Sequence, residues 1–154
     1  MKNGQTGLDD ADKRIIAEMK ANCRRSAREL AVELGISPSS FIERLKRIEG
    51  AGIITGYSAN VDHLKLGYEF MALVQISISH GKLLDVQEKI SRLPGVVSVY
   101  DVTGGQDSIA VVMCKSRADL SSLIKKILAT QHVEKTNTSI ILNVVKDQSQ
   151  FLGV

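Results

Sequence analysis

The chain has 154 residues, of which 44% are hydrophobic, and 20 basic against 17 acidic residues give a formal net charge of only +3. This length allows one domain or two small ones with buried cores, and so small a charge excludes a general coat for polyanions. No apolar run approaches a membrane span, and the polar start MKNGQTG lacks the apolar region of a signal peptide, so we expect a cytoplasmic protein without membrane contact.

The first third of the chain spaces its apolar residues as helices do. Over residues 9–22 one face is apolar and the first turn is acidic, which complements the helix dipole. Ser26 and Glu29 then fit the capping box S-x-x-E at the start of a second helix. That helix has an apolar face and ends at a glycine able to adopt the left-handed conformation: Ala27, Leu30, Ala31, Leu34 and Gly35.

A third helix follows after a tight turn. Ser37 can cap it, and Pro38 suits its first position, where no amide donor is needed. Its inward residues and its terminating glycines are at the expected spacing: Phe41, Leu45, Ile48, Gly50 and Gly52. Two short helices joined in this way predict a helix-turn-helix, whose second helix enters the major groove of DNA.

The pattern changes near Tyr57. Residues 53–62 are too short and too β-rich for a fourth helix, and we interpret them as a wing strand running into a linker. We therefore divide the chain into a helix-turn-helix domain over residues 1–56, a wing or linker over 57–68, and a second domain over 69–154.

The sequence of the second domain predicts an α+β fold. Alternation of apolar and polar residues indicates strands, 3.6-residue spacing indicates helices, and Gly104-Gly105-Gln106 forms a hairpin turn. The expected order is strand-helix-strand-strand-helix-strand, the ferredoxin-like βαββαβ arrangement. We expect strands over residues 70–78, 96–103, 107–114 and 136–146, the last with Ile140, Leu142 and Val144 on one face.

The two helices of such a domain cover only one face of the sheet, so the other face should be polar in a monomer. Several residues expected there are apolar instead: Met71, Leu73, Ile141 and Val145. An apolar second face favours association between subunits, although contact with the linker of the same chain is the simpler alternative.

Three N-terminal segments stand out: LDDADKRIIAEM, RRSARELAVELGISPSS and RLKRIEGAGIITGYSANVD. A C-terminal segment, VYDVTGGQDSIAVVM, contains G-x-x-D as Gly104 and Asp107. In this order and at these spacings, the segments resemble the Lrp/AsnC (feast/famine) family of transcription regulators over almost the whole chain, from Leu8 to about Gln148. The resemblance implies a winged helix-turn-helix joined to a ferredoxin-like domain that drives dimerisation and often assembly into octamers.

Candidate DNA contacts lie on the third helix, at its cap Ser37, and at Arg25 in the turn before the second helix. The first residues of the third helix should meet base edges of double-stranded DNA, and Arg44 suits either a guanine or a phosphate. Glu43 can accept from cytosine or pair with Arg47 four residues on, and we favour the pair. We expect phosphate contacts from the remaining basic residues. The full candidate set is Arg25, Ser37, Ser39, Ser40, Glu43, Arg44, Lys46 and Arg47.

The resemblance also implies a small-molecule effector, commonly an amino acid, that binds between dimers. By position in the family pattern, the effector residues are Tyr100, Gly104, Asp107, Thr136, Thr138 and Ser139. Asp107 can accept from a ligand ammonium, or it can bond the amides of its own turn. Gln106 departs from the aromatic or bulky residue of many relatives, which alters the expected pocket.

Other functions remain open at this point. The three histidines are scattered, and no nucleophile-base pair or phosphate loop is visible, so we predict no enzyme. Cys23 and Cys114 have neither disulfide nor zinc spacing, so we expect buried thiols, no metal and no cofactor. An architectural DNA-binding protein without an effector is the main alternative, and a sensor that has lost DNA binding is another.

Overall fold

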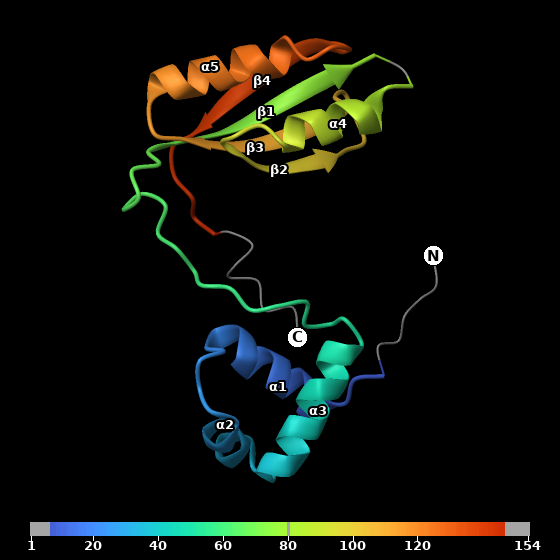
Figure 1. Cartoon of the computed structure of the whole chain (residues 1–154), viewed down its shortest axis with the longest axis vertical. Helices are drawn as coiled ribbons and strands as arrows, with labels where there is room; N and C mark the ends of the chain where they lie inside the picture. The colour runs from blue at the N-terminus through green and yellow to red at the C-terminus, as the bar shows by residue number, and fades with distance from the viewer. Residues whose placement is uncertain (1–6, 80, 147–154) are drawn as a thin grey trace. The chain divides into compact units, whose positions relative to one another are not determined.

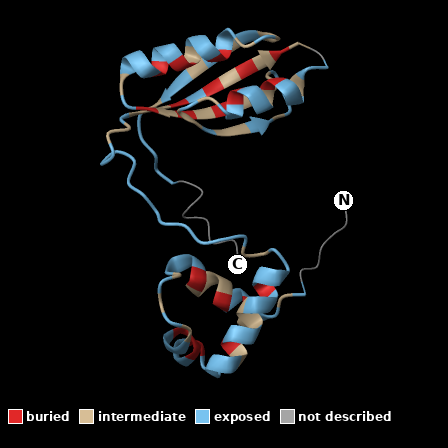
Figure 2. Ribbon diagram, in the orientation of Figure 1, coloured by how far each residue is buried: buried red, intermediate tan, exposed pale blue. Residues whose placement is uncertain are grey.

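The computed structural model describes residues 7–79 and 81–146 (Figure 1). The chain forms two compact units, one up to Asn60 and one over Val61–Val145. Each unit has its own cluster of buried apolar side chains, drawn in red in Figure 2. Two separate cores agree with the two-part plan of the sequence. Among the helices that the structure describes, none combines the length and apolarity needed to cross a bilayer.

The first unit contains three helices: α1 (Asp10–Ala21), α2 (Ala27–Leu34) and α3 (Pro38–Gly50). The predicted caps are present. Ser26 and Glu29 form a reciprocal capping box, and the Ser37 hydroxyl accepts a hydrogen bond from the Ser40 amide at 3.1 Å. Gly35, with φ of +70°, turns the chain between α2 and α3, as predicted for a helix-turn-helix.

The core of this unit comes from all three helices. Phe41 of α3 is 1% exposed and belongs to a cluster that also contains Ile15, Met19, Leu30, Ala31, Leu34 and Ile48. Every one of these side chains lies on the apolar face that helical spacing assigned to its helix. Packing of these faces fixes the direction in which α3 presents its polar side.

The predicted wing strand is not formed. After a turn at residues 51–54, residues 55–62 have no strand conformation, and the first strand in the described part of the chain begins at Phe70. A strand needs a hydrogen-bonded partner, and the neighbouring sequence provides none. The Tyr57 hydroxyl instead donates to a Glu49 carboxylate oxygen at 2.6 Å, which joins the start of this segment to α3.

The second unit has the predicted element order: β1 (Phe70–Ile78), α4 (Leu83–Ser91), β2 (Val96–Asp101), β3 (Ser108–Cys114), α5 (Arg117–Leu128) and β4 (Val133–Ile141). Its four-stranded sheet has the order β2-β3-β1-β4, and each pair of neighbours is antiparallel. The alternate β1 residues from Ala72 to Ile78 pack with apolar residues of α4 and α5. This is the predicted ferredoxin-like fold.

The predicted strand ends need correction. β2 stops at Asp101 rather than Thr103, and β3 starts one residue later than predicted. β4 runs from Val133 to Ile141 rather than from 136 to 146, because its partner β1 starts at Phe70 and Met71 pairs with Ile141. The expected strand face was wrong in part, since Leu142 and Val144 lie beyond β4 and are exposed.

The face of the sheet away from α4 and α5, here called the open face, is apolar in part. The register places Leu73 opposite Val111 and Met71 opposite both Met113 and Ile141. Ile109 also belongs to this face, whereas Val145 lies outside the strands. The sequence thus found part of the open face correctly and missed its β3 residues.

The two thiols differ in exposure. Cys114 is buried, and burial, followed by the nearby Asp119 carboxylate, raises the pKa of its thiol. Cys23 is only half-buried, so the prediction of burial was wrong for this residue. Among the described residues no group of three or more histidine, cysteine, aspartate or glutamate side chains is arranged to hold a metal ion.

Candidate DNA interface and effector site

Four candidate residues share one side of α3. Ser40, Glu43, Arg44 and Arg47 follow the i, i+3, i+4, i+7 spacing of one helix face, and they line a hollow of about 250 Å³. Ser39 and Lys46 are exposed on the same helix. Ser37 is engaged as the cap, and its hydroxyl also lies 3.0 Å from that of Ser39. The first turn of α3 therefore carries short hydroxyls, and the guanidinium groups of Arg44 and Arg47 follow further along the helix.

Both arginines in the hollow contact carboxylates of α1. Arg44 Nη1 donates to both oxygens of Asp9, at 2.9 and 2.7 Å, and to Asp12 Oδ1 at 2.8 Å. Arg47 Nη2 donates to the other oxygen of Asp12, whose side chain is fully buried. The favoured Glu43–Arg47 pair was wrong, because the buried carboxylate of Asp12 is the better-placed partner for Arg47. We call Asp9, Asp12, Arg44 and Arg47 the arginine–aspartate cluster.

The cluster shifts the ionisation of its members. The hydrogen bond from Arg44, followed by that from the Asp12 amide, lowers the pKa of Asp9 below its ordinary value of 3.8. The same bonds, first to Asp9 and then to Asp12, raise the pKa of Arg44. The contacts between α1 and α3 are therefore favoured by the charged forms of both side chains.

Acid should weaken this contact. Since the folded-state pKa of Asp9 is lowered, the stability that its charge contributes is fully present above the unfolded pKa near 3.8 and is lost as the pH falls through the folded value. Thermal unfolding measures this effect. As the pH falls from about 5 to about 2.5, the difference in Tm between wild type and Asp9→Asn should shrink. The Tm difference between wild type and the control Asp10→Asn should change less. A constant Tm difference for Asp9→Asn would contradict the stabilising role of the Asp9 charge.

Arg25 lies in the turn before α2 and bridges two helices. Its Nη1 donates to Glu18 of α1 at 3.2 Å, and its Nη2 donates to Glu33 of α2. The Glu33 contact, and after it the charges of the neighbouring glutamates, raises the pKa of Arg25. This side chain has a structural role in addition to the predicted phosphate contact, which remains a prediction.

The effector candidates at the hairpin turn contact the end of β1. The Asp107 carboxylate accepts from the Ile78 amide at 2.8 Å, and the Asp107 amide donates to the Ile76 carbonyl at 3.1 Å. Gln106 accepts from the Ser77 hydroxyl at 3.0 Å. Gly104 has φ of +124°, a conformation that favours glycine. Asp107 thus bonds an amide of the neighbouring strand rather than of its own turn.

The remaining effector candidates lie on other strands and faces. Tyr100 is on β2, on the open face, whereas Thr136 and Thr138 are on β4 opposite Ile76 and Val74, on the face that α4 and α5 cover. Ser139 is on the open face. β2 and β4 are the two edges of the sheet, separated by three strand spacings or about 14 Å. One chain therefore brings Asp107 and Thr136 to either side of Ile76 but does not gather all six residues.

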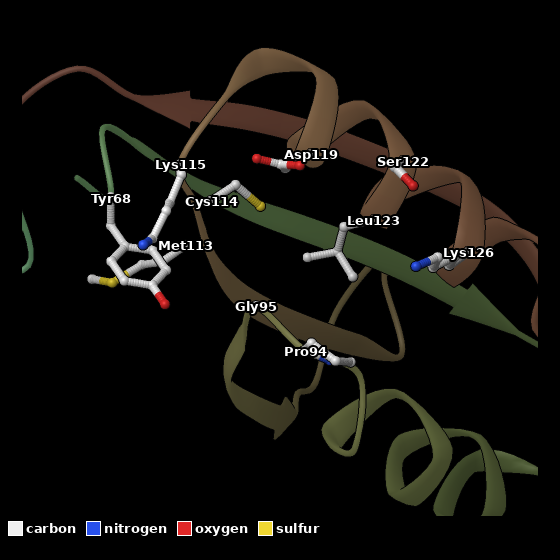
Figure 3. Close-up of a pocket in the computed structure, with 10 residues that line it drawn as sticks. All are labelled: Tyr68, Pro94, Gly95, Met113, Cys114, Lys115, Asp119, Ser122, Leu123 and Lys126. Carbon is white, nitrogen blue, oxygen red and sulfur yellow. The ribbon is translucent and has the colours of Figure 1, made fainter. Parts of the chain in front are cut away.

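Sequence reasoning missed two features. Asp9 and Asp12 were assigned only to the helix dipole, because nothing in a linear pattern reveals a contact across 35 residues. The second is a cleft of about 300 Å³ between the Pro94–Gly95 turn and α5 (Figure 3). Lys115 lies there with its Nζ 5.2 Å from the centre of the Tyr68 ring, and Asp119 and Lys126 line the same cleft. Its polar groups are exposed, and no sequence motif marked it.

Comparisons with known proteins agree with this arrangement. Residues 8–55 match the model for winged helix-turn-helix DNA-binding domains, and residues 71–151 match that for the Lrp/AsnC ligand binding domain. The chain is 35% identical over 140 residues to the uncharacterized HTH-type transcriptional regulator PF1734 of Pyrococcus furiosus, covering 91% of this chain and 95% of the relative.

Solved structures give the same result over both units. The structure of AsnC from E. coli superposes with a TM-score of 0.86 at 30% identity, covering 92% of this chain and 96% of AsnC. The regulator NMB0573 from Neisseria meningitidis, solved in complex with L-Met, gives 0.86 at 26% identity, covering 95% and 97%. Together with the helix-turn-helix and the ferredoxin-like domain described above, these matches show that the chain belongs to the Lrp/AsnC family of transcriptional regulators.

Proposed function

We propose that this regulator reads a specific duplex sequence with α3, as a dimer or larger assembly, and that an amino acid modulates binding. The observation that carries the proposal is the hollow of α3, where two arginines lie beside the Ser40 hydroxyl on one helix face. Arginine and serine are side chains that contact base edges and phosphates. We further propose that the protein acts in the cytoplasm by binding and not by catalysis.

Self-association and the effector have their own support. The open face carries a contiguous set of apolar side chains, of which Leu73 is exposed and the others are half-buried, and such a set is typical of a surface that another subunit covers. Tyr100 lies on one edge strand of the sheet and Thr136, Thr138 and Ser139 lie on the other, as expected if a ligand site is completed by a second copy. The L-Met complex of the Neisseria relative supports an amino acid as the ligand class.

The proposal is tested by selection of duplexes from a random pool, followed by anisotropy titration near physiological salt. We expect the enriched duplex to bind far more tightly than a scrambled duplex of the same composition, and the affinity to shift when mixed amino acids are added. Equal affinity for both duplexes would favour the architectural alternative. Selective binding that no amino acid changes would remove the effector from the proposal.

Arg44→Ala should weaken binding to the enriched duplex by about 1–3 kcal/mol and relax the preference for one base pair. A guanidinium that reads a guanine edge contributes to one sequence only. Lys46→Ala is the matched control, since Lys46 is exposed on the same helix and is expected to contact phosphate. It should weaken binding to all duplexes alike. A uniform loss for Arg44→Ala would assign Arg44 to a phosphate instead, and thermal unfolding of each variant excludes a folding defect.

Asp107→Asn should abolish the amino-acid response without unfolding the domain. The asparagine keeps an oxygen that can accept from the Ile78 amide but removes the charge that would attract a ligand ammonium. Isothermal titration with mixed amino acids measures the effect. Asp101→Asn is the control, because it makes the same charge change on an exposed residue of the same hairpin. An unchanged response in Asp107→Asn would leave Asp107 with its structural bond only.

A further inference from the structure

The contacts of Arg44 use only one side of its guanidinium. All three carboxylate oxygens are bonded to Nη1, and no hydrogen bond within the described residues uses Nε or Nη2. A guanidinium has five N–H donors, of which Nη1 carries two. The other three donors belong to a side chain that is 28% exposed and lines the hollow on α3. Arg44 is therefore held on one side and available to an external acceptor on the other.

The arginine–aspartate cluster is also electrically neutral as a group. It combines two carboxylates with two guanidiniums at hydrogen-bond distance. The field that Arg44 and Arg47 would exert on any phosphate backbone is offset by Asp9 and Asp12. Because the carboxylates hold the Arg44 guanidinium in place, less conformational entropy is lost when DNA docks. The offset charge also weakens the attraction to phosphates, which does not depend on the DNA sequence.

We propose that Asp9 is a specificity-determining residue that acts through Arg44. Its carboxylate orients the guanidinium with Nε and Nη2 toward docked DNA, and it reduces the general attraction of α3 for phosphates. Asp12, being fully buried, anchors the same network from beneath. The inference rests on the proposed function, since it requires that Arg44 contacts DNA.

The variants must preserve the helix cap, because the Asp9 carboxylate also accepts from the Asp12 amide at 2.9 Å. Serine and asparagine both cap helices well, so Asp9→Ser and Asp9→Asn retain that role and remove the charge from Arg44. The matched control is Asp10→Asn, one residue away. Asp10 has a side chain that is 99% exposed, and its ion pair is with Lys13 at 3.6 Å. All three variants change the net charge by the same amount.

The measured quantity is the ratio of Kd for the scrambled duplex to Kd for the enriched duplex. Both Asp9 variants should lower this ratio about three- to tenfold, as expected when a long side chain must be ordered on binding. They should also steepen the dependence of log Kd for the scrambled duplex on log salt by about one, because Arg44 becomes available to phosphates. Asp10→Asn should leave the ratio unchanged. Equal ratios for the Asp9 variants and the control would overturn the proposal.

A double-variant cycle separates this role from a purely structural one. In an Arg44→Ala background, Asp9→Asn should no longer change the ratio, because Asp9 acts through Arg44. A change of the same size in that background would overturn the proposal, and thermal unfolding reports any loss of stability separately. If Arg44→Ala lowers the ratio while the Asp9 variants do not, this inference alone fails. If wild type binds both duplexes equally, the proposed function fails and the inference fails with it.

Discussion

Phe41→Ala should unfold the N-terminal unit and leave the ferredoxin-like unit folded. Phe41 is 1% exposed at the centre of the three-helix core, and truncating a buried phenylalanine typically costs about 3–5 kcal/mol. A unit of about 50 residues has a total stability of only about 3–8 kcal/mol. The loss is therefore comparable to the whole stability of the unit, and DNA binding should disappear with it.

The measurement is thermal unfolding followed by circular dichroism and by amide NMR. We expect the signals of α1, α2 and α3 to be lost at low temperature, whereas those of the sheet keep the wild-type midpoint, because the two cores share no residue. Ile42→Ala is the control, since Ile42 is the next residue of α3 and is 42% exposed. Simultaneous loss of both units in Phe41→Ala would show that their stabilities are coupled.

The helices of the first unit could be predicted because their signals are local. A capping serine, a glutamate three residues on and a proline at the first helical position act within one turn of the chain. Ser26 and Ser37 cap α2 and α3 as expected, and Gly35 has the left-handed conformation that ends α2. Nothing from the rest of the fold is needed to place these elements.

The strand ends and the predicted wing strand depend on hydrogen-bonded neighbouring strands, which the sequence does not reveal. β4 ends at Ile141, opposite Met71, although Leu142 and Val144 continue the alternation; in this register Leu142 would face Phe70, the first residue of β1, and Val144 would face Tyr68, which lies before the strand. The same reasoning applies to residues 55–62, where β-rich composition occurs without a second strand. Composition predicts a tendency to be extended, and pairing decides whether a strand forms.

The candidate site was predictable only as far as one helix face. The spacing of Ser40, Arg44 and Arg47 places them together on α3, and the structure agrees. Their partners Asp9 and Asp12 come from packing of α1 against α3, which no local pattern encodes. The effector residues came from resemblance alone, and the sheet order separates Tyr100 from Thr138 by three strand spacings.

Val111→Glu should dissociate the proposed assembly into monomers with intact folds. Val111 lies at the centre of the open face, opposite Leu73 of β1 and Ser98 of β2, so its side chain is outside the core that α4 and α5 cover. In a monomer the glutamate remains in contact with water. Between two apolar sheet faces it would be a buried charge without a partner, which costs about 3–5 kcal/mol. The dimer Kd should therefore rise at least about 100-fold.

Sedimentation velocity over a range of protein concentrations measures this shift, and circular dichroism confirms that the sheet persists. Ser121→Glu is the control, because it adds the same charge on an exposed residue of α5, the helix that covers the other face. Unchanged sedimentation of Val111→Glu would mean that the open face contacts another part of the same chain.

If the variant is monomeric, its DNA affinity should fall further than that of Arg44→Ala, since one α3 reads a single half-site and loses the effective concentration that a second provides. The relative size of these two losses therefore distinguishes the contribution of assembly from that of base contact.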